Sequence, residues 1–239
     1  GYRPPPAWEA CRAAVIDFHR DAFGWDIPEG DMSLLPDVLS SLKVVIGRLT
    51  RPGSPVIVPT PAYIPFLTIP GLLDREAIEV PAIRGDGVSS PAWSLDLEGI
   101  EAAMAAGAGL LILCNPWNPV GRVLSADELD AIAALSSKYG VIVFSDEIHS
   151  PLVLPGGARH TAYASRPGAE AALTFTATAA SKGWNIPGLR CAQLIASGEA
   201  RVRFDADPVC SGLPEGASIL GVLATTAAIS EGREWNAAV

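Results

Sequence analysis

The sequence predicts an α/β protein, a three-layer sandwich in which a mostly parallel seven-stranded sheet lies between layers of helices. Two continuous apolar runs, at 110–114 and 141–144, are typical of strands buried on both faces of such a sheet. Helical patterns lie between most of the strand candidates, as parallel neighbouring strands require. The 239 residues are 49 % hydrophobic and 18 % charged, a composition that supports a large core.

The first half of the chain starts with a helix, because apolar residues recur at helical spacing over 7–23 and Gly24 ends the pattern. A short apolar run at 32–35 predicts a strand. A turn and an apolar helical face at 38–49 follow, and Pro52 stops the helix. The other elements expected here are strands at 56–58 and 77–80, a mostly helical segment at 63–73 interrupted by Pro65 and Pro70, and a loop at 84–91.

In the second half, strand and helix patterns alternate regularly. The expected helices are 97–105, 126–138 and 216–229. The expected strands are 110–113, 141–144, 172–176 and 191–195, which complete the seven. A further element is expected to start at 231–235. We therefore predict two parts, with residues 1–30 as an N-terminal helix and connector and residues 31–239 as one large domain.

Composition and charge argue against several classes of function. The net charge of −9 and the scattered positions of the 17 Lys and Arg residues argue against a nucleic-acid partner. No run reaches the about 18 apolar residues that span a bilayer, and the first residues do not form a signal peptide, so we expect no membrane partner. Cys11, Cys114, Cys191 and Cys210 lack metal-site spacing, which predicts free thiols in the cytoplasm and no metal centre.

Lys182 is the most distinctive residue, since it lies among small and apolar residues with no acidic neighbour in sequence. Such surroundings predict a partly desolvated amine, whose lowered pKa makes it a nucleophile toward carbonyl groups. A lysine that simply ends a core strand is the structural alternative. The segments that follow the other strands therefore decide between the two interpretations.

Those segments carry residues suited to a ligand, and ligands bind beyond the carboxyl ends of parallel strands. The helix start at Val38 and Leu39 offers free backbone N–H groups to a phosphate. Tyr63 offers an aromatic ring, and a proline-rich turn holds the amide of Asn118 in place. Asp146 follows a buried strand and is either a helix N-cap or a functional carboxylate.

An amine, a carboxylate, an amide, an aromatic ring and a phosphate nest match the needs of pyridoxal 5′-phosphate (PLP). The segments Asn115-Pro-Trp-Asn-Pro-Val-Gly-Arg122, Ser145-Asp-Glu-Ile-His149 and Ser181-Lys-Gly-Trp-Asn-Ile-Pro-Gly-Leu189 resemble, in order and spacing, motifs of fold-type I PLP enzymes of the class I/II aminotransferase superfamily. They look most like those of the MalY/PatB branch of cystathionine β-lyases (C–S lyases). The resemblance covers nearly the whole chain.

The resemblance implies a role for each matching residue. Lys182 would form the Schiff base with PLP and then move the proton at the substrate Cα, while Asp146 would pair with the pyridinium nitrogen. Tyr63 would stack on the ring, and Asn118 and His149 would lie beside its phenolic oxygen. The residues implied to hold the phosphate are Val38, Leu39, Thr178 or Ser181, Arg190, and Tyr2, which would reach the phosphate of the neighbouring subunit in a homodimer.

The chain also departs from the family pattern. Asp37 stands where relatives often have glycine, Ala179 lacks a common hydroxyl, and Trp117 replaces a histidine. The small C-terminal domain that normally supplies an arginine for the substrate α-carboxylate is missing. The arginines considered as replacements, each expected to be a solvated loop residue instead, are Arg3, Arg84, Arg122 and Arg159.

Three functions fit these residues. The first is a PLP-dependent C–S β-lyase, which would convert cystathionine or a related cysteine S-conjugate into a thiol, pyruvate and ammonia. The second is an aminotransferase that uses the same residues on an α-amino acid. The third is a non-catalytic PLP-binding or regulatory module. The motifs indicate the cofactor more strongly than they indicate the reaction.

Overall fold

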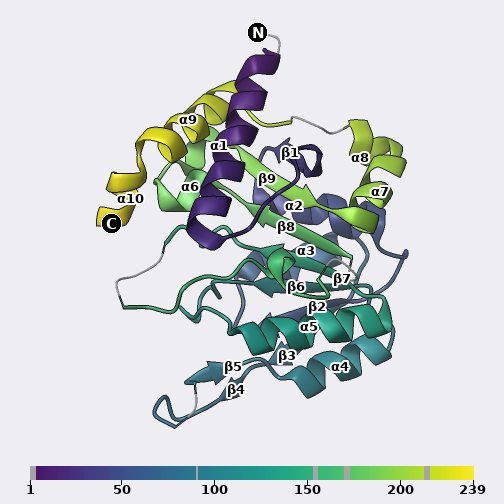
Figure 1. Ribbon diagram of the computed structural model, residues 1–239. Coiled ribbons are helices and arrows are strands. Elements are labelled where there is room, and N and C mark those ends of the chain that lie inside the picture. The colour runs from purple at the N-terminus through teal and green to yellow at the C-terminus, as the bar shows by residue number, and fades with distance from the viewer. Residues whose placement is uncertain (1–3, 90, 153–155, 170–172, 213–215) are drawn as a thin grey trace.

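The structure, a computed structural model, describes residues 4–89, 91–152, 156–169, 173–212 and 216–239. The strands of its main sheet are β1 (Met32–Leu35), β2 (Val56–Thr60), β3 (Ala77–Pro81), β6 (Leu110–Cys114), β7 (Ile142–Asp146), β8 (Thr174–Thr178) and β9 (Ala192–Ala196). They lie in the order β1-β9-β8-β7-β6-β2-β3, from the top to the bottom of Figure 1. The seven predicted strands are therefore confirmed.

The sheet is mostly parallel, as predicted. Neighbouring strands are parallel from β8 through β7, β6 and β2 to β3. Strand β9 is antiparallel to both of its neighbours, β8 and β1. The chain therefore enters β9 at the edge of the sheet where the strands on either side end.

The described helices are α1 (Pro5–Phe23), α2 (Val38–Val44) with a π-helical turn at Val45–Leu49, α3 (Ile64–Leu72), α4 (Leu97–Ala105), α5 (Ala126–Tyr139), α6 (Ala180–Gly183), α7 (Gly198–Ala206), α8 (Pro208–Gly212), α9 (Ile219–Glu231) and α10 (Arg233–Ala238). Short 3₁₀ turns lie at Glu29–Asp31, Tyr163–Ser165 and Pro187–Leu189. Helix α5 shows why the boundaries fall where they do. Ser125 and Glu128 form a reciprocal capping box at its start, and Gly140 ends it in the left-handed conformation.

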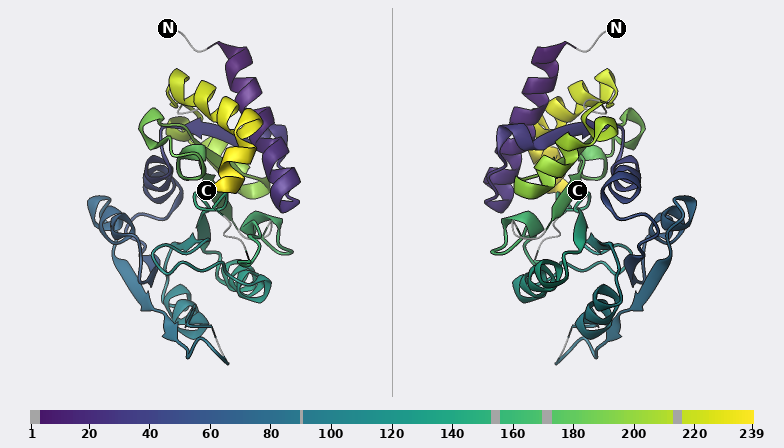
Figure 2. Two further views of the ribbon diagram at one scale, coloured as in Figure 1. Left: turned by 90° about the vertical axis from the view of Figure 1, so that its left-hand side faces the viewer. Right: turned by 90° about the vertical axis from the view of Figure 1, so that its right-hand side faces the viewer.

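Alternate residues of the central strands face opposite layers of helices. Val58 and Phe144 pack in the layer that contains α2, α3 and α7, whereas Ile57 and Val143 pack against α4 and α5. Helices α1 and α9 cover the other end of that second face, over β1 and β9, and lie side by side in Figure 1. Figure 2 shows the helices on both sides of the sheet. The predicted three-layer sandwich is confirmed.

Some predicted boundaries were wrong. Strand β7 continues two residues beyond the predicted end, so Asp146 is its last residue. The expected loop at 84–91 connects β4 (Ile83–Arg84) to β5 (Trp93–Ser94), two short paired strands that were not predicted, and of its described residues only Arg84 belongs to a strand instead. Prolines do not interrupt α3, because Pro65 lies in its first turn, where no backbone N–H is required, and Pro70 lies near its end. Helices α7 and α8 were not predicted, since α7 lacks an apolar face of helical period.

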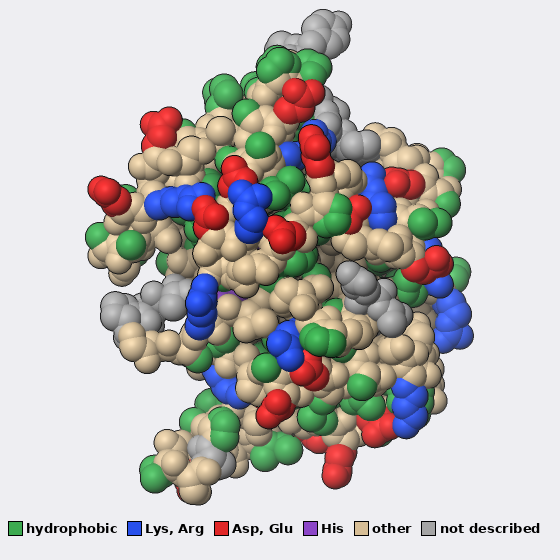
Figure 3. Space-filling view, viewed as in Figure 1, with side chains coloured by type: hydrophobic (Ala, Val, Ile, Leu, Met, Phe, Trp, Pro, Cys, Tyr) green, Lys and Arg blue, Asp and Glu red, His purple; other side chains and the backbone are tan. Residues whose placement is uncertain are grey.

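The structure also locates the charged side chains and the four cysteines. Basic and acidic side chains are interspersed on the face shown in Figure 3. No helix in the described ranges is long and apolar enough to cross a membrane. All four cysteines are free thiols, and three are buried while Cys114 is half-buried. Tyr2 lies outside the described residues, as does Arg3.

Candidate active site

The predicted site residues gather at one edge of the sheet for a topological reason. Because β1, β2, β6, β7 and β8 run in the same direction, the residues that follow them meet at a single edge. Arg190 reaches the same edge because it lies just before β9, which runs the opposite way. The fold therefore brings the basic, acidic and amide groups of distant segments together.

Asp146 is the buried carboxyl of this edge, with 5 % of its surface exposed. Its Oδ1 accepts a hydrogen bond from the backbone N–H of Ile148 at 3.0 Å, which is the local capping contact that the structural interpretation expected. Burial raises the pKa of Asp146 to about 7, while the Ile148 bond and the charge of Lys182 act in the opposite direction. A carboxylate that only caps a backbone N–H does not need to be buried. The burial and raised pKa of Asp146 therefore favour the functional carboxylate over the structural cap.

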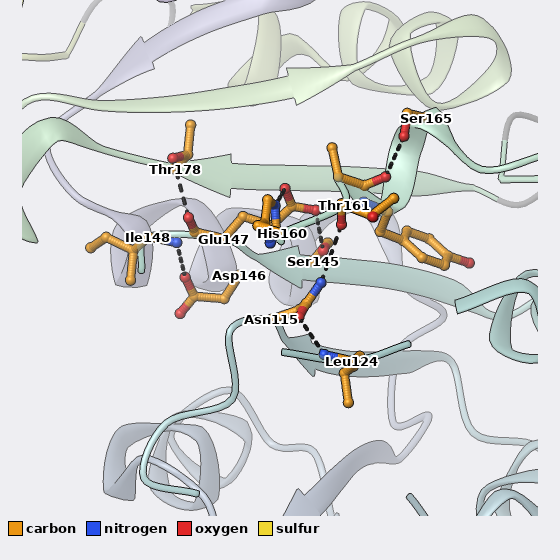
Figure 4. A network of polar contacts seen from close by, with 12 residues as sticks. Asn115, Leu124, Ser145, Asp146, Glu147, Ile148, His160, Thr161, Ser165 and Thr178 are labelled. Atoms are coloured by element: carbon orange, nitrogen blue, oxygen red, sulfur yellow. Dashed lines mark hydrogen bonds and ion pairs between the residues drawn. The ribbon is translucent and has the colours of Figure 1, made fainter. Parts of the chain in front are cut away.

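Sequence reasoning missed the role of Glu147, which follows Asp146 and has a fully buried side chain. Figure 4 shows its carboxylate between Ser145 and His160. Glu147 accepts a hydrogen bond from the Ser145 hydroxyl and another from the backbone N–H of Tyr163, both at 2.9 Å. Its second oxygen lies 2.9 Å from Nε2 of His160, which is also buried. This network fixes the segment that carries Asp146. The sequence feature that could have revealed it is His160, which lies 13 residues after Glu147, an acid that directly follows a buried strand.

The two asparagines of the proline-rich turn have different environments. Asn115 is fully buried, donates to the carbonyl of Thr161 at 3.3 Å and accepts the Leu124 N–H at 3.0 Å, as drawn in Figure 4. Asn118 is only half-buried and lines a cavity with His149. Asn115 therefore anchors the turn, while Asn118 remains available to a ligand.

Lys182 lies on the short helix α6, directly beyond β8. The sequence predicted a partly desolvated amine, and this was wrong for the described chain, because the Lys182 side chain is exposed. Its positive charge nevertheless acts to lower the pKa of His149 and partly opposes the rise in the pKa of Asp146. The three groups therefore share one electrostatic environment. Burial is the larger cause for His149, so its imidazole is neutral at neutral pH. Apolar neighbours in sequence did not predict exposure, since α6 carries Lys182 away from the core.

The expected phosphate nest contains its own acid. Asp37 caps α2 by accepting the Ser40 N–H at 2.7 Å, and its second oxygen forms an ion pair with Arg190. The first-turn N–H groups of Val38 and Leu39 have no acceptor within the helix. Arg190 and the start of α2 therefore meet as the resemblance implies, but an internal carboxylate already lies between them.

The other predicted ligands lie in different positions. Tyr63 precedes α3 and remains 44 % exposed, with its ring perpendicular to that of Phe66. Thr178 is buried and its hydroxyl donates to the backbone carbonyl of Glu147 at 3.4 Å. Ser181 is half-buried on α6, next to Lys182. Of the two hydroxyls considered for the phosphate, the Ser181 hydroxyl is the more accessible.

The described arginines considered for a substrate carboxylate have partners within the protein. Arg84 lies over the ring of Trp93, with 4.9 Å between its guanidinium carbon and the ring centroid. Arg122 forms two hydrogen bonds to Glu128, at 2.7 and 2.6 Å. Arg159 donates to the carbonyl of Ala22 at 2.9 Å. Each of the three guanidinium groups therefore has a partner within the protein. The expectation of a solvated loop residue was wrong for Arg122, whose side chain is only 19 % exposed, and for Arg84, which belongs to strand β4.

A sheet of this order between two helix layers, with a lysine, a carboxylate and an asparagine at one edge, defines the fold of the PLP-dependent transferases. Residues 5–232 match the model of the family described as aminotransferase class I and II. The chain belongs to this family.

Individual relatives give the same result. The chain is 37 % identical to a cystathionine β-lyase of Corynebacterium glutamicum, over 97 % of this chain and 59 % of that protein. It is 33 % identical to cystathionine β-lyase PatB of Bacillus subtilis, over 98 % of this chain and 59 % of that protein. The crystal structure of cystalysin from Treponema denticola, which contains PLP, covers 100 % of this chain and 59 % of its own, with 29 % identity and a TM-score of 0.88. The chain thus spans about three fifths of the length of these relatives.

Proposed function

We propose that the protein is a PLP-dependent C–S β-lyase, which cleaves a cysteine S-conjugate such as cystathionine into a thiol, pyruvate and ammonia. The observation that carries this proposal is the group formed by Asp146, His149 and Lys182 at the carboxyl edge of the sheet. The similarity to two cystathionine β-lyases supports the choice of reaction within the family.

The residues at this edge fit the cofactor. Burial raises the pKa of Asp146 to about 7, and this cost is relieved when a cation lies against the carboxylate. A protonated ring nitrogen is such a cation, so Asp146 would hold the pyridine end. Lys182 would supply the amine that bonds the aldehyde, and the exposed side chain of Tyr63 would stack on the cofactor ring. At the phosphate end, PLP fits only if the ion pair between Asp37 and Arg190 opens, so that Arg190 can bind the phosphate.

PLP, when bound, would supply an electron sink conjugated to the substrate Cα. The exposed amine of Lys182 can take the proton from Cα, because its stem is not packed in the core. Asp146 stabilises positive charge at the ring nitrogen. Asn118 and the neutral imidazole of His149 would bind the phenolic oxygen and orient the ring, without carrying the proton. The Glu147 network holds Asp146 in place.

The same residues would serve an aminotransferase, and the family includes such enzymes. The two reactions differ in what they need. Elimination needs a leaving group on Cβ and no second substrate, whereas transamination needs a keto-acid acceptor. A further alternative is a PLP-binding module without turnover.

We also propose that the protein is a cytoplasmic homodimer. The four free cysteines support a reducing compartment. The resemblance of Tyr2 to a tyrosine that reaches a neighbouring phosphate supports a second copy of the chain. Light scattering coupled to size-exclusion chromatography measures the mass of the assembly in solution, and a monomer at all concentrations would contradict the dimer.

Product analysis tests the reaction. The PLP-loaded protein should release a thiol and pyruvate from cystathionine or another cysteine S-conjugate with no keto acid present. A Lys182→Ala variant should lose this release, whereas Lys138→Ala should retain it, since Lys138 pairs with Glu101 away from the site. Amino-group transfer to 2-oxoglutarate without thiol release would assign the protein to the aminotransferases. PLP uptake without either product would favour the binding module.

A further inference from the structure

A cavity of about 510 Å³ opens beside the candidate active site. Asn118 and His149, the two residues expected to bind the phenolic oxygen, form part of its wall. Its wall also includes Trp117, Val123 and Leu152, together with prolines and small residues. The volume lies within the range of about 300–1,000 Å³ that is typical of small-molecule sites. The cavity is therefore large enough for the side chain of an amino acid.

The wall around Trp117 is preformed. The Trp117 indole N–H donates to the carbonyl of Pro61 at 2.9 Å, which fixes the ring. Two backbone hydrogen bonds close the turn that follows, from Trp117 to the carbonyl of Arg122 at 2.6 Å and from Gly121 to that of Trp117 at 2.7 Å. An apolar wall held this way does not have to be ordered by the ligand, which favours binding.

The one charged side chain in the described wall, that of Arg122, is already neutralised. Glu128 holds its guanidinium through two hydrogen bonds, and only 19 % and 13 % of the Arg122 and Glu128 side chains are exposed. Burial acts to raise the pKa of Glu128, but the hydrogen bonds from Arg122 and Ser125 bring it below its ordinary value. The carboxylate therefore stays charged at neutral pH and keeps Arg122 paired.

His149 adds no charge to this wall, because burial and the nearby Lys182 lower the pKa of its imidazole. The described wall thus offers apolar surface, an amide and a neutral imidazole. A charged substituent that entered would lose its water without gaining an ionic partner, whereas an alkyl group would lose only unfavourable hydration.

We infer that this cavity receives the side chain of the amino-acid substrate and selects an uncharged, apolar group. The inference rests on the proposed function and narrows it. The preferred substrates are then S-alkylcysteines and similar thioethers, and cystathionine, whose distal end carries both an ammonium and a carboxylate, should be a poorer substrate than these. Trp117, Val123 and Leu152 are the large apolar residues of the wall that would make this choice.

Binding of amino acids that lack a leaving group on Cβ tests the inference without elimination. Alanine, norvaline and norleucine form an apolar series, and glutamate and lysine carry a charge at a similar length. Calorimetry and the visible absorbance of the PLP-loaded protein report their dissociation constants. We expect the constant to fall about fourfold per methylene along the apolar series. Glutamate and lysine should each bind at least about tenfold more weakly than norleucine.

A charge placed in the wall should reverse this order. Val123→Lys should weaken the binding of norleucine and strengthen the binding of glutamate, since the new cation meets the glutamate carboxylate inside the cavity. The matched control is Val202→Lys, at a residue on α7 that is 62 % exposed and remote from the cavity, and it should change neither constant. If Val123→Lys fails to fold, the series on the unmodified protein still decides the question.

The outcomes separate this inference from the proposed function. Equal binding of norleucine and glutamate, or a preference for glutamate, would overturn the apolar cavity. The lyase proposal would still stand if S-conjugates release a thiol. If no amino acid binds or alters the absorbance of the PLP-loaded protein, both proposals are overturned together.

Discussion

The carboxylate of Asp37 bridges two elements that the sequence separates by 153 positions, because it caps α2 and forms an ion pair with Arg190. The start of a helix and an arginine are the groups that a phosphate would use. Asp37 occupies that place with a negative charge of its own. An incoming phosphate must therefore compete with an internal carboxylate.

Removing the charge of Asp37 should strengthen PLP binding. Asp37→Asn keeps a side-chain oxygen for the Ser40 N–H, so the cap survives while Arg190 is released. We expect the dissociation constant of PLP to fall about fivefold, the scale of a partly exposed ion pair. Asp207→Asn is the matched control, because Asp207 also caps a helix and pairs with an arginine, Arg48, away from the site. Equal PLP affinity in Asp37→Asn and the unmodified protein would contradict this prediction.

Borohydride reduction of the PLP-loaded protein should fix the pyridoxyl group on Lys182. The other lysines, Lys43 and Lys138, have exposed side chains outside the site and should remain unmodified. Lys182→Ala should give a protein without the yellow colour of the bound cofactor. Peptide mass spectrometry locates the adduct, and recovery on Lys43 or Lys138 would refute the assignment.

The stability of the cofactor-free protein should depend on the protonation of Asp146. Its pKa is about 7 in the folded chain, against 3.8 ordinarily, so folding favours the protonated carboxyl. The contribution of Asp146 to the free energy of unfolding should be greatest below about pH 4 and should fall by about 4 kcal/mol as the pH rises through 7. Asp146→Asn should remove this component, and bound PLP should reduce it. Denaturant titrations at several pH values measure it, and parallel pH curves for the two proteins would exclude the effect.

Truncation of Glu147 should destabilise the fold. Glu147→Ala would leave the backbone N–H of Tyr163 and the ring of His160 buried without their acceptor. We expect a loss of about 3 kcal/mol or more in the free energy of unfolding, the scale for breaking a buried charged network. Glu199→Ala, which removes an exposed pair with Arg203, should change stability little. A similar small loss for both variants would show that the Glu147 network is not stabilising.

Continuous apolar patterns made much of the fold predictable. The run at 110–114 is short and continuously apolar, which is typical of a strand buried on both faces, so β6 was placed correctly. Strand β7 was placed one residue early and ended too soon, because Ser145 and Asp146 are polar but still pair with β6. Helix α7 was missed, since most of its side chains face solvent and leave no apolar period.

The sequence predicted which residues form the site, but not how exposed they are or which of them contact one another. Motif spacing identified Asn118, Asp146 and Lys182, which the topology brings to one edge of the sheet. Spacing could not show that Lys182 is exposed, because exposure depends on the direction in which α6 leaves β8. Nor could it pair Asp37 with Arg190, since that contact depends on the antiparallel direction of β9.

The pairing of β1 with β9 and the packing of α1 on α9 also bear on synthesis at the ribosome. Residues 5–35 complete their packing only after residues 192–229 have been made. Until then Trp8, Val15 and Leu34 have no core to enter, although each is fully buried at the end. Sequence separations of this size slow folding and leave apolar surface exposed to aggregation in the meantime. The nascent chain should therefore depend on chaperones for its N-terminal segment until β9 and α9 emerge.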